Sequence, residues 1–208
     1  HPRSKPAAGR DDAAGGRRPA VAMAMSIVLL FIFARSWYHA GITSYYPFYL
    51  IEKYGLRLEQ AQIFIFLFLF SGAIGTFLGG ALSDRFGRRN LMIFSMLGAA
   101  PLTLLLPHVN LLWAYVIMFL NGFIILSSFS VVVVYAQELI PGKVGMVSGL
   151  TIGLAFGLGA IGAAVLGGLA DTYGIDKIME WTALLPLIFP ILFLLPGDRK
   201  LRQWYESN

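Results

Sequence analysis

The chain has 208 residues, of which 57% are hydrophobic and only 13% are charged, and its mean hydropathy is +0.71. Soluble domains carry about 25% charged residues, so this composition indicates a membrane protein whose helices are surrounded by lipid. The net charge of +5 needs no nucleic-acid partner, because basic residues gather in loops and tails beside a membrane. The sequence contains no cysteine, which excludes disulfides, thiol catalysis and thiolate metal sites.

The first segment, residues 1–20, is rich in Arg, Ala, Gly and Pro and is predicted to be a disordered basic tail. The apolar run that follows is longer than the h-region of a signal peptide, and five more runs come after it. We interpret the tail as the remnant of an interdomain linker.

Six apolar runs are long enough for helices that cross about 30 Å of hydrocarbon. The first contains Pro47 near its end, and we expect it to tilt, kink or project from the membrane. The sequence therefore predicts an all-α membrane protein with a six-helix domain over 21–197 and a tail over 198–208. The runs are 21–51, 60–83, 90–107, 110–136, 146–170 and 178–196.

An internal repeat links the second run to the fifth. Gly80-Ala-Leu-Ser-Asp-Arg-Phe-Gly87 matches Gly167-Gly-Leu-Ala-Asp-Thr-Tyr-Gly174 at Gly, Leu, Asp and the final Gly. The offset pairs residues 21–107 with 110–196, and three crossings reverse the direction, so the two units are predicted to be inverted repeats. The alternative is a chance recurrence of Gly-x-x-x-Asp, which leaves six helices unchanged.

The basic residues predict the orientation. With the first segment in the cytoplasm, twelve Lys and Arg residues fall in the cytoplasmic loops and tails and three on the opposite side. Lys and Arg near helix ends resist translocation, so both termini are predicted to be cytoplasmic. The remaining basic residue, Arg35, lies inside the first run.

Arg35 is the strongest candidate for a binding residue. A guanidinium near the centre of a membrane helix costs about 2.5–3.5 kcal/mol, so it should face a polar cavity or a partner. Tyr38, His39, Tyr45 and Tyr46 follow at steps that place much of the set on one side of the helix. These residues are predicted to line a substrate cavity for an anionic or polar compound, and His39 could couple transport to protons. The alternative is that Arg35 and His39 bond to carbonyls or a buried carboxylate.

A second polar line lies in the fourth run, where Asn121, Ser128 and Tyr135 are seven residues apart and share one helix face. They are candidates for the cavity wall opposite Arg35. Hydrogen bonding between helices explains them equally well.

The loop between the second and third runs has the pattern Gly-x-x-x-Asp-Arg-x-Gly-Arg-Arg, which resembles the signature loop of the major facilitator superfamily. Glu138 ends the fourth run on the same side, and we predict a latch of Asp84, Arg88 and Glu138 that biases which side is open. The alternative is that these charges are solvated topology signals. The residues of the pattern are Gly80, Asp84, Arg85, Gly87, Arg88 and Arg89.

Residues 20–205 resemble the C-terminal half of a major facilitator transporter, and three stretches resemble its fosmidomycin-resistance efflux branch. The resemblance implies alternating access, proton antiport and export of a small, often anionic compound from a bacterial or archaeal cytoplasmic membrane. It also implies that Asp84 docks on a helix of the other half and that Arg88 pairs with Glu138. The stretches are Tyr46–Ile51, Ser83–Arg89 and Tyr135–Leu150.

The family works with twelve helices, so we expect this six-helix chain to be half of a transporter. A second half would come from the same longer chain or from a dimer, and the isolated monomer should not transport. Uptake of a sugar or organic acid and a non-transporting membrane module are the alternatives. No enzyme, metal or cofactor site is predicted, because the sequence lacks paired carboxylates, a His cluster or a nucleotide-binding loop at membrane depth.

Overall fold

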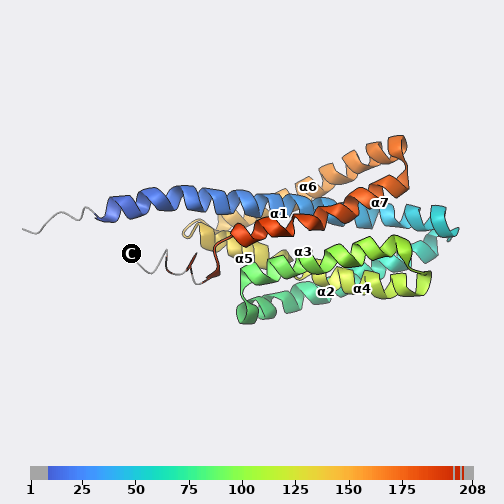
Figure 1. Ribbon diagram of the computed structural model, residues 1–208, viewed down its shortest axis with the longest axis horizontal. Helices are drawn as coiled ribbons and strands as arrows, with labels where there is room; N and C mark the ends of the chain where they lie inside the picture. The colour runs from blue at the N-terminus through green and yellow to red at the C-terminus, as the bar shows by residue number, and fades with distance from the viewer. Residues whose placement is uncertain (1–8, 199, 202, 204–208) are drawn as a thin grey trace, which may run out of the picture.

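The structure, a computed structural model, describes residues 9–198, 200, 201 and 203. All regular structure among these residues is helical, without strands, and the helices lie side by side in an elongated bundle (Figure 1). The elements are α1 Gly9–Tyr54, α2 Leu58–Phe86, α3 Arg88–Leu105, η1 Leu106–His108, α4 Leu111–Leu126, α5 Phe129–Leu139, α6 Val144–Tyr173, α7 Ile175–Leu184 and η2 Leu185–Leu194.

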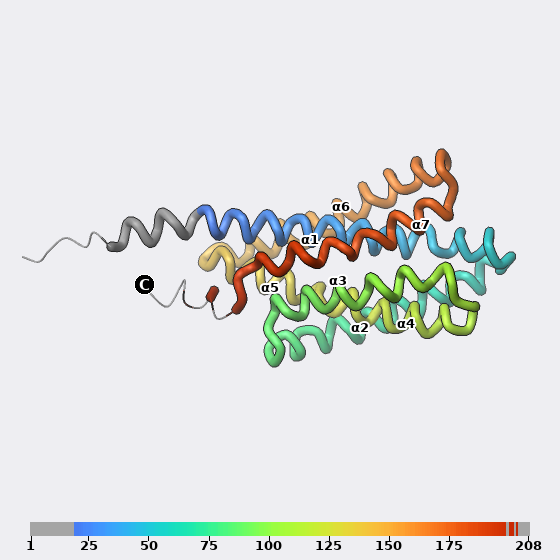
Figure 2. Tube along the Cα trace, viewed as in Figure 1, coloured from blue at the N-terminus to red at the C-terminus, as the bar shows by residue number. Residues whose placement is uncertain are grey.

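Six segments are long and apolar enough to cross a membrane, which confirms the predicted six-helix, all-α fold. Successive segments run in opposite directions along the bundle (Figure 2). The α2–α3 turn, the α5–α6 turn and the end of η2 therefore meet at one end, here called the signature-loop end. The segments are Pro19–Tyr54, Leu58–Phe86, Arg88–His108, Leu111–Leu139, Val144–Tyr173 and Ile175–Leu194.

The first helix starts earlier than the sequence predicted. Helical backbone begins at Gly9, inside the segment 1–20 that was expected to be a disordered tail, and residues 1–8 lie outside the described part of the chain. Adding residues to an existing helix costs far less than starting one, and Ala13 and Ala14 are strong helix formers. The packed helix that follows therefore extends toward the N-terminus.

Two crossings depart from a continuous α-helix. The fourth breaks at Ser127 and Ser128, whose hydroxyls donate to the carbonyls of Ile124 and Ile125 at 2.7 and 3.0 Å. Such bonds compete with the helical ladder. The sixth crossing changes from α7 to the 3₁₀-helix η2, which contains two prolines without an N–H donor.

The two predicted repeats have the same turn geometry. Gly87 and Gly174 adopt φ values of 91° and 85°, which glycine tolerates best, and each separates two helices without a further loop residue. Their N–H groups donate to Ser83 O and Ala170 O, both at 2.9 Å. The helix pairs α2–α4 and α1–α6, which the repeat makes equivalent, both pack closely. This symmetry supports the inverted-repeat prediction.

Candidate functional site

A cavity of about 380 Å³ lies between α1, α2, α4, α5 and α6. Arg35 and His39 of α1, two of the residues that the sequence suggested for a substrate cavity, are among its lining residues. Phe129 begins α5 and Phe156 lies on α6, and both add aromatic surface to the wall. The cavity is therefore mainly apolar with one fixed positive charge.

Arg35 has no acidic partner in this cavity. Only 4% of its surface is exposed, and its guanidinium lies over the Phe129 ring at 4.8 Å from the ring centre. Its Nε and Nη1 atoms are buried without a hydrogen-bond partner, and no Asp or Glu is among the described lining residues. A buried cation left unpaired is costly. This arrangement favours a cavity residue over a structural ion pair.

Hydroxyl groups surround the same cavity, and sequence reasoning missed them. Ser36, Thr43, Ser44 and Thr76 all line it. Thr43 lies four residues after His39 and donates to its carbonyl at 2.8 Å. The period of a helix could have identified Thr43, since it is on the Arg35 face at i+8. Nothing in the local pattern indicates Thr76, because another helix brings it there.

Tyr38 and Asn121 lie away from this cavity, which corrects the prediction that both line it. They are fully buried and form a hydrogen-bonded cluster with Thr103, so α1, α3 and α4 meet at one polar point. The Tyr38 hydroxyl and Thr103 Oγ1 are 2.6 Å apart. Tyr38 and His39 follow Arg35 by three and four residues, so they lie on opposite sides of the helix face that carries Arg35. His39 therefore lies at the cavity, and Tyr38 points into the bundle.

Tyr38→Phe should lower the free energy of unfolding by about 1 kcal/mol, because it removes bonds to two buried polar groups. The affinity for substrate should stay unchanged. Thermal unfolding of the solubilised protein and the KM of transport measure the two effects. A raised KM at unchanged stability would place Tyr38 at the substrate instead.

Three other predicted cavity residues also pack inside the bundle. Tyr46 contacts the rings of Tyr49 and Phe64, Ser128 is part of the helix break, and Tyr135 donates to the carbonyl of Pro196 at 2.7 Å. The hydroxyls of Ser128 and Tyr135 are hydrogen-bonded to backbone carbonyls, and none of the three residues is among those that line the cavity. Tyr45 is half-buried and donates to the carbonyl of Ala163 beside it.

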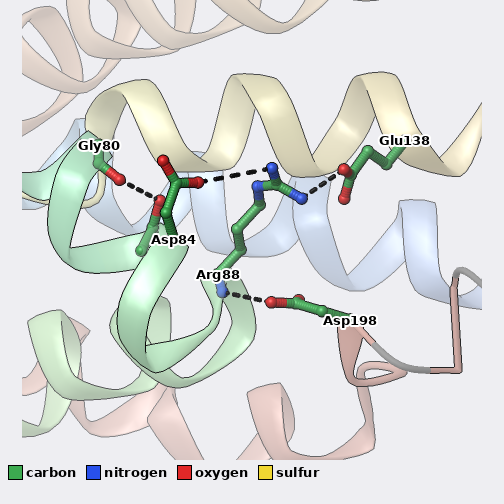
Figure 3. Close-up of polar contacts among 6 residues, drawn as sticks. Gly80, Asp84, Arg88, Glu138 and Asp198 are labelled. Carbon is green, nitrogen blue, oxygen red and sulfur yellow. Dashed lines mark hydrogen bonds and ion pairs between the residues drawn. The ribbon is translucent and has the colours of Figure 1, made fainter.

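The signature-loop end holds the predicted charge cluster (Figure 3). Arg88 lies between two acids: its guanidinium forms a close ion pair with Glu138 of α5 and a looser one, at 3.8 Å, with Asp84. The Arg88 side chain is 18% exposed, whereas Asp84 is 76% exposed. The contact between Arg88 and Glu138 is therefore the stronger one, because exposed ion pairs contribute little.

The remaining residues of the signature loop lie outside this charge cluster and make other contacts. Arg85 lies over the ring of Phe86, 5.7 Å from its centre, and Arg89 donates from Nη2 to the carbonyl of Phe193 at 2.7 Å. Gly80 accepts a bond from the Ser83 hydroxyl at 2.7 Å. Gly87 forms the turn described above. Among the described residues, no group of three or more His, Cys, Asp or Glu could hold a metal ion.

Comparison with known proteins gives the family. The model of the Major Facilitator Superfamily matches residues 2–152. The chain belongs to this superfamily. Its members are transporters rather than enzymes, which confirms the prediction of no enzymatic activity. The resemblance of the loop at residues 80–89 is confirmed with it.

Two relatives match most of this chain. The fosmidomycin resistance protein of Escherichia coli K12 is 48% identical over 182 residues, 88% of the chain. The MFS-type transporter YfnC of Bacillus subtilis 168 is 52% identical over 166 residues, 80% of the chain. The chain spans 45% and 41% of their lengths, somewhat less than half of each relative.

Glu138→Gln tests the latch at this major facilitator loop. The neutral amide ends the ion pair with Arg88, whose guanidinium then has only Asp84 as a charged partner, so the conformation described here should become about tenfold less populated, a cost of about 1.4 kcal/mol. Labelling of single cysteines at the signature-loop end measures that population. Lys143→Gln, an exposed charge at the same end, is the control. An unchanged distribution in Glu138→Gln would contradict the latch.

Proposed function

We propose that this chain is one half of a transporter that exports a small anionic compound by alternating access. The observation that carries the proposal is Arg35, a buried cation with two unpartnered nitrogens at a cavity whose lining, in the described part of the chain, contains no acid. An anionic substrate would supply the missing counter-charge. Charge-assisted bonds are about twice as strong as neutral ones, so such a substrate would gain most of its affinity there.

The rest of the cavity fits a small compound with an apolar body. Ligand sites typically enclose about 300–1,000 Å³, and this cavity of about 380 Å³ lies near the lower limit. The hydroxyls of Ser36 and Ser44 offer donors to the anion, whereas those of Thr43 and Thr76 donate to the carbonyls of His39 and Leu126, and Phe129 and Phe156 offer apolar contact. His39 lies in the same wall and is our candidate for coupling the transport step to protons.

We further propose that a second six-helix bundle completes the transporter. Four glycines of α6 (Gly145, Gly149, Gly153 and Gly157) recur every four residues, and an added Cβ at any of them would meet nothing within 4 Å. Such a stripe allows another helix to approach closely. The excess of Lys and Arg in the loops and tails predicted to be cytoplasmic supports cytoplasmic termini, and the bacterial relatives support a bacterial inner membrane.

Drug resistance in cells tests the export proposal. The full-length protein would be expressed in a fosmidomycin-sensitive bacterium, and everted vesicles would be assayed for accumulation of fosmidomycin with and without a proton gradient. Raised resistance and gradient-dependent accumulation support proton-coupled export. Accumulation in cells would indicate an uptake permease. If no tested organic anion or sugar is moved, the proposal is rejected, and the alternative of a non-transporting membrane module is favoured.

A further inference from the structure

Residues 193–198, which comprise the last two residues of η2 and the turn that follows it, are here called the C-terminal turn and join three parts of the bundle. It accepts hydrogen bonds from the start of α3 and from the middle of α5, although the sequence predicted only a tail from residue 198 onward. The bonds are Arg88 N to Asp198 Oδ2 at 2.9 Å, Arg89 Nη2 to Phe193 O at 2.7 Å and Tyr135 OH to Pro196 O at 2.7 Å.

Asp198 acts as the N-terminal cap of α3. The first N–H groups of a helix have no acceptor within it, and the residue before α3 is Gly87, which has no side chain to offer one. The Asp198 carboxylate accepts from the first of these groups, where the helix dipole favours a negative charge. A Cβ on Gly87 would come within 3.1 Å of Asp198 Oδ2, so glycine leaves room for the carboxylate.

The capped residue is also the latch residue. Arg88 is held by its backbone to Asp198 and by its guanidinium to Glu138 (Figure 3). Tyr135, one turn before Glu138 on α5, bonds the same C-terminal turn. The contacts therefore form a closed ring through α3, α5 and the C-terminal turn. We therefore expect the loss of one of these contacts to shift the residues that form the others.

We propose that Asp198 is a positioning residue of the Arg88–Glu138 latch. It fixes the start of α3 so that the Arg88 guanidinium reaches Glu138, and it releases that start when the transporter changes its open side. The expected effect of Asp198 on the transport rate rests on the proposed transport function. Its effect on conformation needs no substrate, so the two proposals can fail separately.

The test uses a single reporter cysteine: these 208 residues contain none, and any cysteine elsewhere in the full-length protein would first be replaced by serine. Val131→Cys would be introduced in the full-length protein as a reporter, because Val131 is 1% exposed and lines a small cavity beside Asp84 and Arg88. Its alkylation rate would be compared in Asp198→Ala, in Asp198→Asn and in the exposed control Lys200→Ala. Vmax and KM of transport would be measured on the same proteins.

Asp198→Ala should raise the alkylation rate about tenfold, as expected for loss of a helix cap, and lower Vmax with little change in KM. Asp198→Asn keeps an acceptor oxygen and should raise the alkylation rate only about threefold. Lys200→Ala should change neither. In a Glu138→Gln background the effect of Asp198→Asn should disappear, because the ion pair that Asp198 positions is already lost.

Two results would overturn the proposal. One is an unchanged alkylation rate in Asp198→Ala. The other is a double variant in which Asp198→Asn raises the alkylation rate by the same factor with Glu138→Gln as without it. The two residues would then act independently. The second result can be obtained even if Asp198→Ala does not fold. If the conformational effects occur but no substrate is moved, only the transport function is rejected.

Discussion

Arg35→Met should lower transport of an anionic substrate about 100-fold, because truncating one partner of a buried charge pair costs about 2–5 kcal/mol. The same change should leave the empty protein at least as stable, since it replaces an unpaired buried cation by an apolar side chain that still packs on Phe129. Transport into proteoliposomes and thermal unfolding measure the two effects. Loss of function with retained stability is the signature of a binding residue.

Arg35→Lys is the matched variant. It keeps the charge but loses the planar set of donors, so transport should fall to an intermediate value. If Arg35 were instead a structural residue, Arg35→Met would unfold the protein, and the surviving fraction would transport normally. Anion transport at the wild-type rate in a folded Arg35→Met protein would contradict the substrate role.

Gly75→Ala should destabilise the bundle by about 3 kcal/mol, at the upper end of the usual cost of overpacking. An added Cβ at Gly75 would collide with the backbone carbonyl of Phe123 on α4, and a backbone cannot move aside as a side chain can. An added Cβ at Gly79 or Gly122 would likewise collide with a backbone carbonyl of the facing helix. Unfolding of the solubilised protein in denaturing detergent measures the loss.

Gly168→Ala is the control for this prediction. Gly168 lies on α6, and a Cβ there would meet nothing within 4 Å. Its substitution should be neutral or stabilise the helix by up to about 1 kcal/mol, as helix propensity requires. Equal destabilisation by both substitutions would show that close packing of α2 on α4 does not hold the bundle together.

The fold could be predicted from the sequence because its causes are local. Apolar runs of membrane-crossing length, separated by charged turns, produce six helices, and Gly87 and Gly174 mark the repeat. The helix break at Ser127 and Ser128 was harder to predict from the sequence. A serine pair inside an apolar run is compatible with a continuous helix unless its hydroxyls bond the preceding carbonyls.

The site was predictable only in part. Arg35 was identified because a membrane-buried cation is costly in any fold, and Glu138 because it ends a helix on the same side as Arg88. Asn121 and Tyr38 could not be separated from the cavity residues, since polar groups inside a membrane serve binding and packing equally. Thr76 and Asp198 were missed because contacts between distant segments create their roles.

The most direct test is an experimental structure of the full-length protein with a small organic phosphonate such as fosmidomycin bound. The account predicts ligand density in the cavity between α1, α5 and α6, with an anionic oxygen within hydrogen-bond distance of the Arg35 guanidinium. Density at a different site, together with an Arg35 side chain that faces acyl chains or pairs with an acid, would contradict it.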